Sequence, residues 1–226
     1  MMRAARSLLF IALLPLFTGC QLLDAPRQSV SHAGQARMQG ELTAADGKLV
    51  FQPCQEQRRY VVNDSGGTSV LQQAASLADE RGKLFADVRG HIVSSAAAGA
   101  DSQLDVEQLY RLERSGTACE DVDFKRVILR AAGHSPEWTL KASGKGLVLD
   151  REGQPPLAVP YVEEQLGDGR FNLGTEANGQ KVELWVTPAR CVDSVTGSVQ
   201  HMSAELRVNG QVQRGCAYFG LSLIHI

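Results

Sequence analysis

The sequence predicts a mainly β protein with two small units, a barrel that includes one helix and a second antiparallel β-barrel or sandwich. Short runs of alternating apolar and polar residues recur along the chain with turn residues between them, and only one segment has helical spacing. The formal net charge of the 226 residues is −2, and no long block of like charge is present. The composition therefore indicates neither a nucleic-acid-binding surface nor a basic patch for anionic lipids.

Residues 1–19 have the pattern of a secretory signal. Arg3 and Arg6 precede an apolar run at 8–17, which is shorter than the roughly 20 residues of a membrane-spanning helix. Cys20 follows Thr-Gly at the end of this run, and the sequence around it resembles the lipobox of bacterial lipoproteins. The resemblance implies cleavage before Cys20 and acylation of that cysteine with chains such as palmitate. The alternative is an ordinary signal cleaved nearby, which leaves Cys20 as a free thiol.

Lipidation of Cys20 would decide where the protein resides. Each buried methylene contributes about 0.8 kcal/mol, so three acyl chains on one residue hold a protein at a membrane. Gln21 after the cysteine resembles the pattern of lipoproteins that are sent to the outer membrane. We therefore expect a protein anchored in the inner leaflet of the outer membrane and facing the periplasm. Residues 20–36, with Pro26, Gly34 and little apolar content, predict a flexible tether.

Four further cysteines form an even set, as expected in an oxidising compartment. Four cysteines allow three pairings, and their clustering along the chain favours Cys54–Cys119 and Cys191–Cys216. The alternative is a metal site. No two of these cysteines lie within four residues of each other, and no histidine stands beside them at ligand spacing, so we expect no bound metal.

The first unit, expected at 37–120, begins with a hairpin. Ala44-Ala45-Asp46-Gly47 is a turn signal between two β-prone runs. After the third strand, apolar residues recur at helical spacing from Val70 to Ala78, with Thr68 as the expected N-cap and Gly82 as the stop. The expected elements are strands 38–43, 48–52 and 58–62, a helix at 70–78, and strands 83–93 and 104–112.

Two details complete this half. Gly90 lies inside a strand pattern and predicts a β-bulge, and the Ala/Ser/Gly tract at 94–100 predicts a loop. Three strands, a helix and two strands follow one another in the order of an OB-fold barrel. The face of strands 2 and 3, where OB folds bind oligomers, would show Gln52, Arg58 and Tyr60, which is no basic stacking platform.

Several landmarks of this half resemble the C-terminal OB domain of NlpE-type envelope lipoproteins. They are Phe51-x-x-Cys54, Tyr60-x-Val62, the Ala/Leu-rich helix, Ala86-Asp87-Val88-Arg89-Gly90-His91 and Val106-Glu107. The resemblance implies an OB fold, a bridge between Cys54 and Cys119, and a role in reporting on the state of the envelope. NlpE proteins also have an N-terminal domain with a Cys-x-x-Cys motif, which this chain lacks, so copper handling is not carried over.

The second β-rich unit, expected at 126–220, follows a polar linker at 121–125. Turn signals such as Asn178-Gly179 and Asn209-Gly210 recur at regular spacing, which predicts a small antiparallel barrel or sandwich. The expected strands are 127–131, 137–141, 146–149, 158–162, 170–173, 181–186, 202–208 and 211–218. Gly133-x-x-Pro136-x-Trp138 and the ending around Cys191 and Cys216 resemble a family of uncharacterised periplasmic and lipoprotein β-domains, which has no established activity to lend.

The last six residues, 221–226, are Leu-Ser-Leu-Ile-His-Ile. One reading frame of the mosaic-end adapter of transposase-based sequencing libraries encodes this hexapeptide. We therefore expect these residues to be a sequencing artefact; the alternative is an alternating terminal strand. An independent read of the locus that continues through the same six codons would contradict the artefact.

Catalytic motifs are missing from the sequence. It has no Gly-x-Ser-x-Gly elbow, His-Glu-x-x-His helix, Walker loop or dinucleotide fingerprint. His91 is expected on a strand surface, and His201 and Met202 are neighbours that would face opposite sides of a strand rather than share a copper ion. Glu163 and Glu164 are expected in a solvated turn. We therefore expect no catalytic, cofactor-binding or metal-binding residue; Trp138 and Trp185 are expected in the core of the second unit.

Two classes of function remain, and we expect no enzyme. The first is a lipid-tethered binding or sensing module that meets an unidentified periplasmic protein or senses envelope stress or surfaces. For this class the NlpE resemblance implies that the Cys54–Cys119 bridge acts as a sensor of folding state. The second is an inhibitor or scaffold of a periplasmic cell-wall enzyme such as a lysozyme, in which a loop of the second unit enters the cleft of the enzyme.

Overall fold

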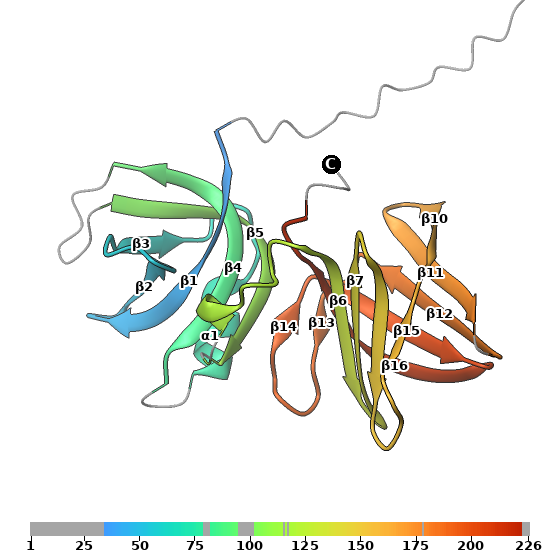
Figure 1. Ribbon diagram of the computed structural model, residues 1–226. Coiled ribbons are helices and arrows are strands. Elements are labelled where there is room, and N and C mark those ends of the chain that lie inside the picture. Colours follow the sequence, from blue (N-terminus) through green and yellow to red (C-terminus); the bar gives the residue numbers. More distant parts are fainter. Residues whose placement is uncertain are drawn as a thin grey trace, which may run out of the picture. The chain divides into compact units, whose positions relative to one another are not determined.

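The structure is a computed structural model that describes residues 34–222, except 79–81, 95–101, 115, 117 and 178 (Figure 1). The expected signal, the lipidation site Cys20, nearly all of the tether at 20–36, the loop at 94–100 except its first residue, and the last four residues of the expected artefact lie outside the described residues. No helix in the described part of the chain is long and apolar enough to cross a membrane.

The first half forms a closed five-stranded barrel with one helix, as expected. Strand β1 pairs with both β2 and β4, β2 pairs with β3, and β3 runs parallel to β5, which closes the ring against β4 (Figure 1). This is the strand order of the OB fold. The elements are β1 (Ala36–Ala45), β2 (Lys48–Pro53), β3 (Tyr60–Asn63), α1 (Val70–Leu77), β4 (Leu84–Val93) and β5 (Ser102–Arg114), with a short 3₁₀ turn η1 (Ala118–Glu120) after them.

The inner face of the barrel is built by residues that alternate along its strands. Phe51, Tyr60 and Leu104 are almost fully buried in this core. The predicted bulge at Gly90 is confirmed, because the register between β4 and β5 shifts between Arg89 and Gly90. A Cβ atom at Gly90 would lie 2.0 Å from the carbonyl oxygen of Asp105, so the bulge leaves no room for a side chain there.

Helix α1 begins at Val70 as predicted, but its N-cap is one residue later than expected. Ser69 is the N-cap residue, in the left-handed region at φ 62°, whereas Thr68 was the expected cap. The Thr68 hydroxyl still accepts a hydrogen bond from the backbone N–H of Val70 at 3.2 Å. Thr68 therefore satisfies the first N–H group of the helix from just outside it.

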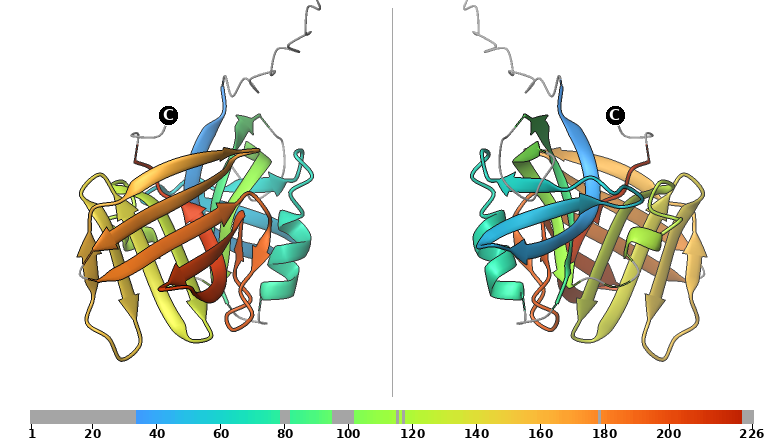
Figure 2. Two further views of the ribbon diagram at one scale, coloured as in Figure 1. Left: turned by 90° about the vertical axis from the view of Figure 1, so that its right-hand side faces the viewer. Right: turned by 90° about the vertical axis from the view of Figure 1, so that its left-hand side faces the viewer.

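The second half forms a nine-stranded antiparallel sheet in the order β10-β11-β12-β15-β16-β6-β7-β8-β9. Its edge strands β9 and β10 are joined only by Pro160 and Tyr161, so the sheet curls until its two edges lie near each other (Figure 2). The strands are β6 (Val127–His134), β7 (Glu137–Ser143), β8 (Gly146–Arg151), β9 (Leu157–Val159), β10 (Val162–Gly167), β11 (Arg170–Ala177), β12 (Gln180–Thr187), β15 (Met202–Val208) and β16 (Gln211–Phe219).

The single strand expected at 158–162 is wrong. The chain leaves the sheet at Pro160, which has no N–H group to donate to a ladder, and returns as β10 at the opposite edge. Glu163 and Glu164, expected in a turn, belong to this edge strand. Their positions opposite Leu173 and Asn172 place the two carboxylates on alternate faces of the sheet.

A short hairpin of the second half belongs to the sheet of the first. Strands β13 (Cys191–Val192) and β14 (Val199–Gln200), which the sequence did not predict, extend that sheet beyond β5. Val199 pairs with Leu112 and Gln200 pairs with Arg111. Residues of the expected second unit thus add two strands to the first sheet, and the division at the linker 121–125 stays a prediction.

The outer face of β4 is buried as well as its inner face. Asp87, which points away from the barrel core, has no exposed surface. The Arg37 guanidinium donates to both of its carboxylate oxygens, from Nε at 2.8 Å and from Nη2 at 2.7 Å. Arg37 also donates to the backbone carbonyls of Phe219 and Gly220, at 2.6 and 2.9 Å. This ion pair therefore ties the first strand of the barrel to the end of the last strand of the second half.

Candidate functional site

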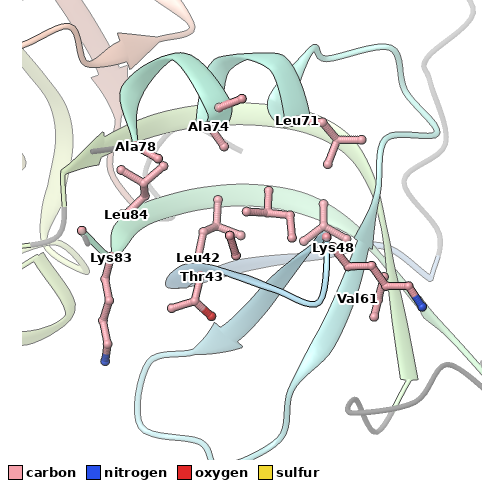
Figure 3. A pocket seen from close by; sticks show the side chains of 15 residues that line it. Leu42, Thr43, Lys48, Val61, Leu71, Ala74, Ala78, Lys83 and Leu84 are labelled. Carbon is pink, nitrogen blue, oxygen red and sulfur yellow. The ribbon is translucent and has the colours of Figure 1, made fainter. Parts of the chain in front are cut away.

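The first barrel has a cavity between helix α1 and the hairpin of β1 and β2 (Figure 3). Its volume of about 720 Å³ lies within the range of roughly 300–1,000 Å³ that is usual for sites of small ligands. We call this cavity the helix groove. Its apolar lining comes from β1, β2, β3, α1 and the start of β4: Leu42, Ala44, Leu49, Val61, Val62, Leu71, Ala74, Ala75, Ala78 and Leu84.

Small side chains on the helix create this space. Helix α1 directs Val70, Ala74 and Leu77 into the barrel core. Ala75 lies on the neighbouring face, is exposed, and lines the groove one helical turn after Leu71. Because alanine ends at Cβ, it does not fill the gap between helix and hairpin, and a larger residue at position 75 would.

The floor of the groove belongs to the packed core, whereas its mouth is open. Leu42 and Leu84 are each 2% exposed, and Val62 is 7% exposed. Leu71 at the mouth is 38% exposed. The groove is therefore a preformed apolar surface that remains accessible from outside.

Two lysines stand at the edge of the apolar lining (Figure 3). The Lys83 ammonium lies 2.7 Å from a carboxylate oxygen of Glu41, and this pair is exposed enough to be weak. Lys48 has no ion pair with any residue that the structure describes. Thr43 adds a hydroxyl group to the lining. The two side chains lie at opposite sides of the lining, and their ammonium groups point away from each other (Figure 3).

The disulfide pairing predicted from the sequence is confirmed. Cys54, just after β2, is bonded to Cys119 in η1, and Cys191 in β13 is bonded to Cys216 in β16. The Cα atoms are 5.4 and 5.5 Å apart, as is usual for a bridge. Neither bridge lines the helix groove.

The histidines singled out in the sequence have structural surroundings. His91 lies on the strand surface as expected, with Nδ1 2.9 Å from a carboxylate oxygen of Glu107. His201 and Met202 face opposite sides as expected: Met202 is in the core of the second sheet, and Nδ1 of His201 contacts the carbonyl oxygen of Tyr110 at 3.0 Å. The pair is therefore not arranged as a common ligand set.

Two aromatic predictions are wrong. Trp138 is in the core of the second half as expected, but Trp185 lies on the outer face of β12, where Arg207 stacks 5.1 Å from its ring centre. Tyr60, expected on the outer face of the barrel, is 2% exposed inside it. In both strands the large amphipathic ring was assigned to the wrong side of an alternating pattern.

Lowering the pH should destabilise the protein through His201. Burial lowers the pKa of His201 to about 4, whereas an exposed histidine titrates near 6.5. Between these two values the unfolded chain binds the proton that the folded chain does not. The free energy of unfolding therefore decreases as the pH is lowered. From pH 7 to pH 5 this group should cost about 2 kcal/mol.

The measurement is urea unfolding at both pH values. His201→Gln should lose about 2 kcal/mol less than the wild type over this interval. An equal loss in both proteins would contradict the assignment.

The helix groove was not predicted from the sequence. The available signal was the spacing of Leu71, Ala75 and Ala78 on one helix face, a stripe on which alanines replace the larger residues of a packed face. Comparison of this chain with protein-family models, with curated proteins and with solved structures gave no match in any of the three.

Proposed function

We propose that this protein is a lipid-anchored, non-enzymatic binding or sensing module of the bacterial envelope, whose first barrel holds an apolar ligand in the helix groove. The observation that carries the proposal is the groove itself, a preformed apolar cavity that is open to solvent beside a packed core. The described residues that line it include no histidine, cysteine or carboxylate, which favours binding over catalysis.

Two features support a location in the bacterial envelope. The N-terminal pattern that ends at Cys20 is that of a lipoprotein signal. The two disulfides are of the kind that forms and persists in oxidising compartments, among which is the periplasm.

Binding in the groove can be tested with N-phenyl-1-naphthylamine, an uncharged dye that becomes fluorescent in apolar surroundings. The protein would be the mature chain from residue 20, exported by a conventional signal with Cys20→Ser so that no lipid competes. The wild-type groove should bind the dye, and Ala75→Phe should reduce its fluorescence at least tenfold by filling the cavity. Ser76→Phe is the matched control, because Ser76 is the exposed next residue and does not line the groove. Equal fluorescence of both variants would contradict the site.

Anchoring is tested separately in cells that express the full chain. Labelled palmitate should be incorporated into the wild type, which should remain in the membrane pellet after a high-salt wash. Cys20→Ala should incorporate no label and leave the pellet, because the variant lacks the sulfur that receives the diacylglyceryl group. If the wild-type protein is soluble and carries no label, the proposed lipid anchor is contradicted.

A further inference from the structure

We infer that two leucines of the chain's own N-terminal segment, Leu22 and Leu23, occupy the helix groove until an apolar ligand displaces them. This inference rests on the proposed function, since it names what regulates access to the same cavity. It is supported by the aliphatic character of the groove and by the length of chain that precedes β1.

The groove has an apolar surface on either side. Leu71 and Ala74 on helix α1 line one side, and Leu42 on β1 and Val61 on β3 line the other (Figure 3). Among the described lining residues none is aromatic, and Thr43 is the one neutral polar side chain. Neighbouring side chains of an extended segment point to opposite sides, so two adjacent leucines can pack against both sides of the groove at once.

The expected tether contains one pair of large apolar residues. The large aliphatic side chains among residues 20–33 are Leu22, Leu23 and Val30. Leu22 and Leu23 are adjacent, whereas Val30 stands between two serines. Burial of two leucines removes more apolar surface from water than burial of one valine, so this pair gains most from an apolar groove.

The length of the chain before β1 lets the two leucines reach the groove. Leu42 in the lining follows Ala36 by six residues, which is about 20 Å along a strand. Leu23 precedes Ala36 by 13 residues, a length that spans up to about 45 Å when extended and about 20 Å on average as a random coil. Val30 precedes Ala36 by only six residues, so it covers this distance only when the chain is fully stretched.

The chain turns just before it enters β1. Gly34, the first described residue, lies in a turn with φ 81°, a left-handed conformation that glycine adopts at no steric cost. A change of direction at this point allows the preceding segment to run back along the barrel toward the groove.

Attachment to the same chain compensates for a weak contact. Strand β1 beside the groove is paired with both β2 and β4, so a peptide finds no free backbone ladder on it, and the leucines bind through their side chains alone. A short link raises the effective concentration of such a segment to roughly the millimolar range, and the effect is largest when the average length of the link matches the span. The segment can therefore fill the groove and still be displaced by a ligand.

Removing the two leucines should strengthen ligand binding. N-phenyl-1-naphthylamine would be titrated into the mature chain with Cys20→Ser, with and without the double substitution Leu22→Ser and Leu23→Ser. The dissociation constant of the dye should fall about three- to tenfold in the double serine variant, because the fraction of open grooves rises. Val30→Ser is the matched control, because it removes an apolar side chain from the same segment, and it should leave the dissociation constant unchanged.

Methyl NMR spectra of the ligand-free protein show where the leucines lie. The double serine variant should shift the methyl resonances of Leu71 and Ala78 in the groove. The methyl resonances of Leu140, in the core of the second half, should stay in place. A general loss of stability does not produce shifts that are confined to the groove, and Val30→Ser should produce none.

The outcomes separate the two proposals. Tighter dye binding together with shifted groove methyls in the double serine variant would support both. If Ala75→Phe abolishes dye binding, but the double serine variant binds the dye as the wild type does and its groove methyls do not shift, the inference is overturned and the binding function stands. If no variant binds the dye and no groove methyl shifts, both proposals are wrong.

Discussion

Replacing both Cys54 and Cys119 by alanine is expected to lower the free energy of unfolding by about 4 kcal/mol. The bridge joins residues that are 65 positions apart, from the end of β2 to η1 beyond β5, and so encloses most of the barrel. In the unfolded chain such a link removes the conformational freedom of a long loop, and alanine at both positions restores it. Both cysteines are partly exposed, so the substitutions leave no buried cavity that would add to the loss.

Urea unfolding of the oxidised proteins measures this loss. The comparison is the Cys191→Ala/Cys216→Ala variant, whose bridge spans only 25 positions and should contribute about 3.5 kcal/mol by loop entropy. Cys216 is 2% exposed, so its substitution adds a packing loss that the first pair does not have. A loss below about 1 kcal/mol for the Cys54/Cys119 pair would show that the bridge does not constrain the unfolded chain.

Asp87→Ala is expected to cost about 3–5 kcal/mol, because it leaves the Arg37 guanidinium nearly buried without its counter-charge. Arg37 is 10% exposed in its side chain, and Asp87 is not exposed at all. The carboxylate of Asp87 also accepts a hydrogen bond from the side-chain amide of Gln39 at 3.0 Å. Loss of the carboxylate therefore removes an acceptor from donors of two side chains at a largely buried site.

The matched control is an exposed pair in the same barrel. Arg58 and Glu56 lie 2.7 Å apart with side chains 65% and 42% exposed, so Arg58→Ala should cost at most about 1 kcal/mol. Removing both charges of the buried pair, as Arg37→Met with Asp87→Leu, should cost less than the sum of the two single variants. If Asp87→Ala and Arg58→Ala lower the free energy of unfolding equally, the buried pair does not contribute more than the exposed one, and the prediction is wrong.

Local patterns in the sequence were sufficient to predict the barrel. The hairpin of β1 and β2, the helix and the bulge at Gly90 each depend on residues that are close in sequence, and each was found within a few positions of its expected place. The clustering of the cysteines also predicted both bridges. Such features are specified by turn residues and by apolar alternation, which a sequence displays directly.

Features that depend on distant residues were missed. Strands β13 and β14 contain two residues each, and the hairpin that they form joins the first sheet through the pairing of β14 with β5, far earlier in the chain. The buried position of Asp87 depends on the arrival of Phe219 and Gly220 at the outer face of β4, together with Arg37. The helix groove exists because alanines leave space, and unfilled space has no periodic signature in a sequence.

The position of β1 has a mechanical consequence. It is the first strand of the described chain and is paired on both sides, through six residue pairs with β2 and seven with β4. Tension applied through the N-terminal segment would act along this strand and load both ladders in shear, so many hydrogen bonds must break together rather than one after another. The clamp of Arg37 on the end of β16 would carry part of the same load into the last strand of the chain.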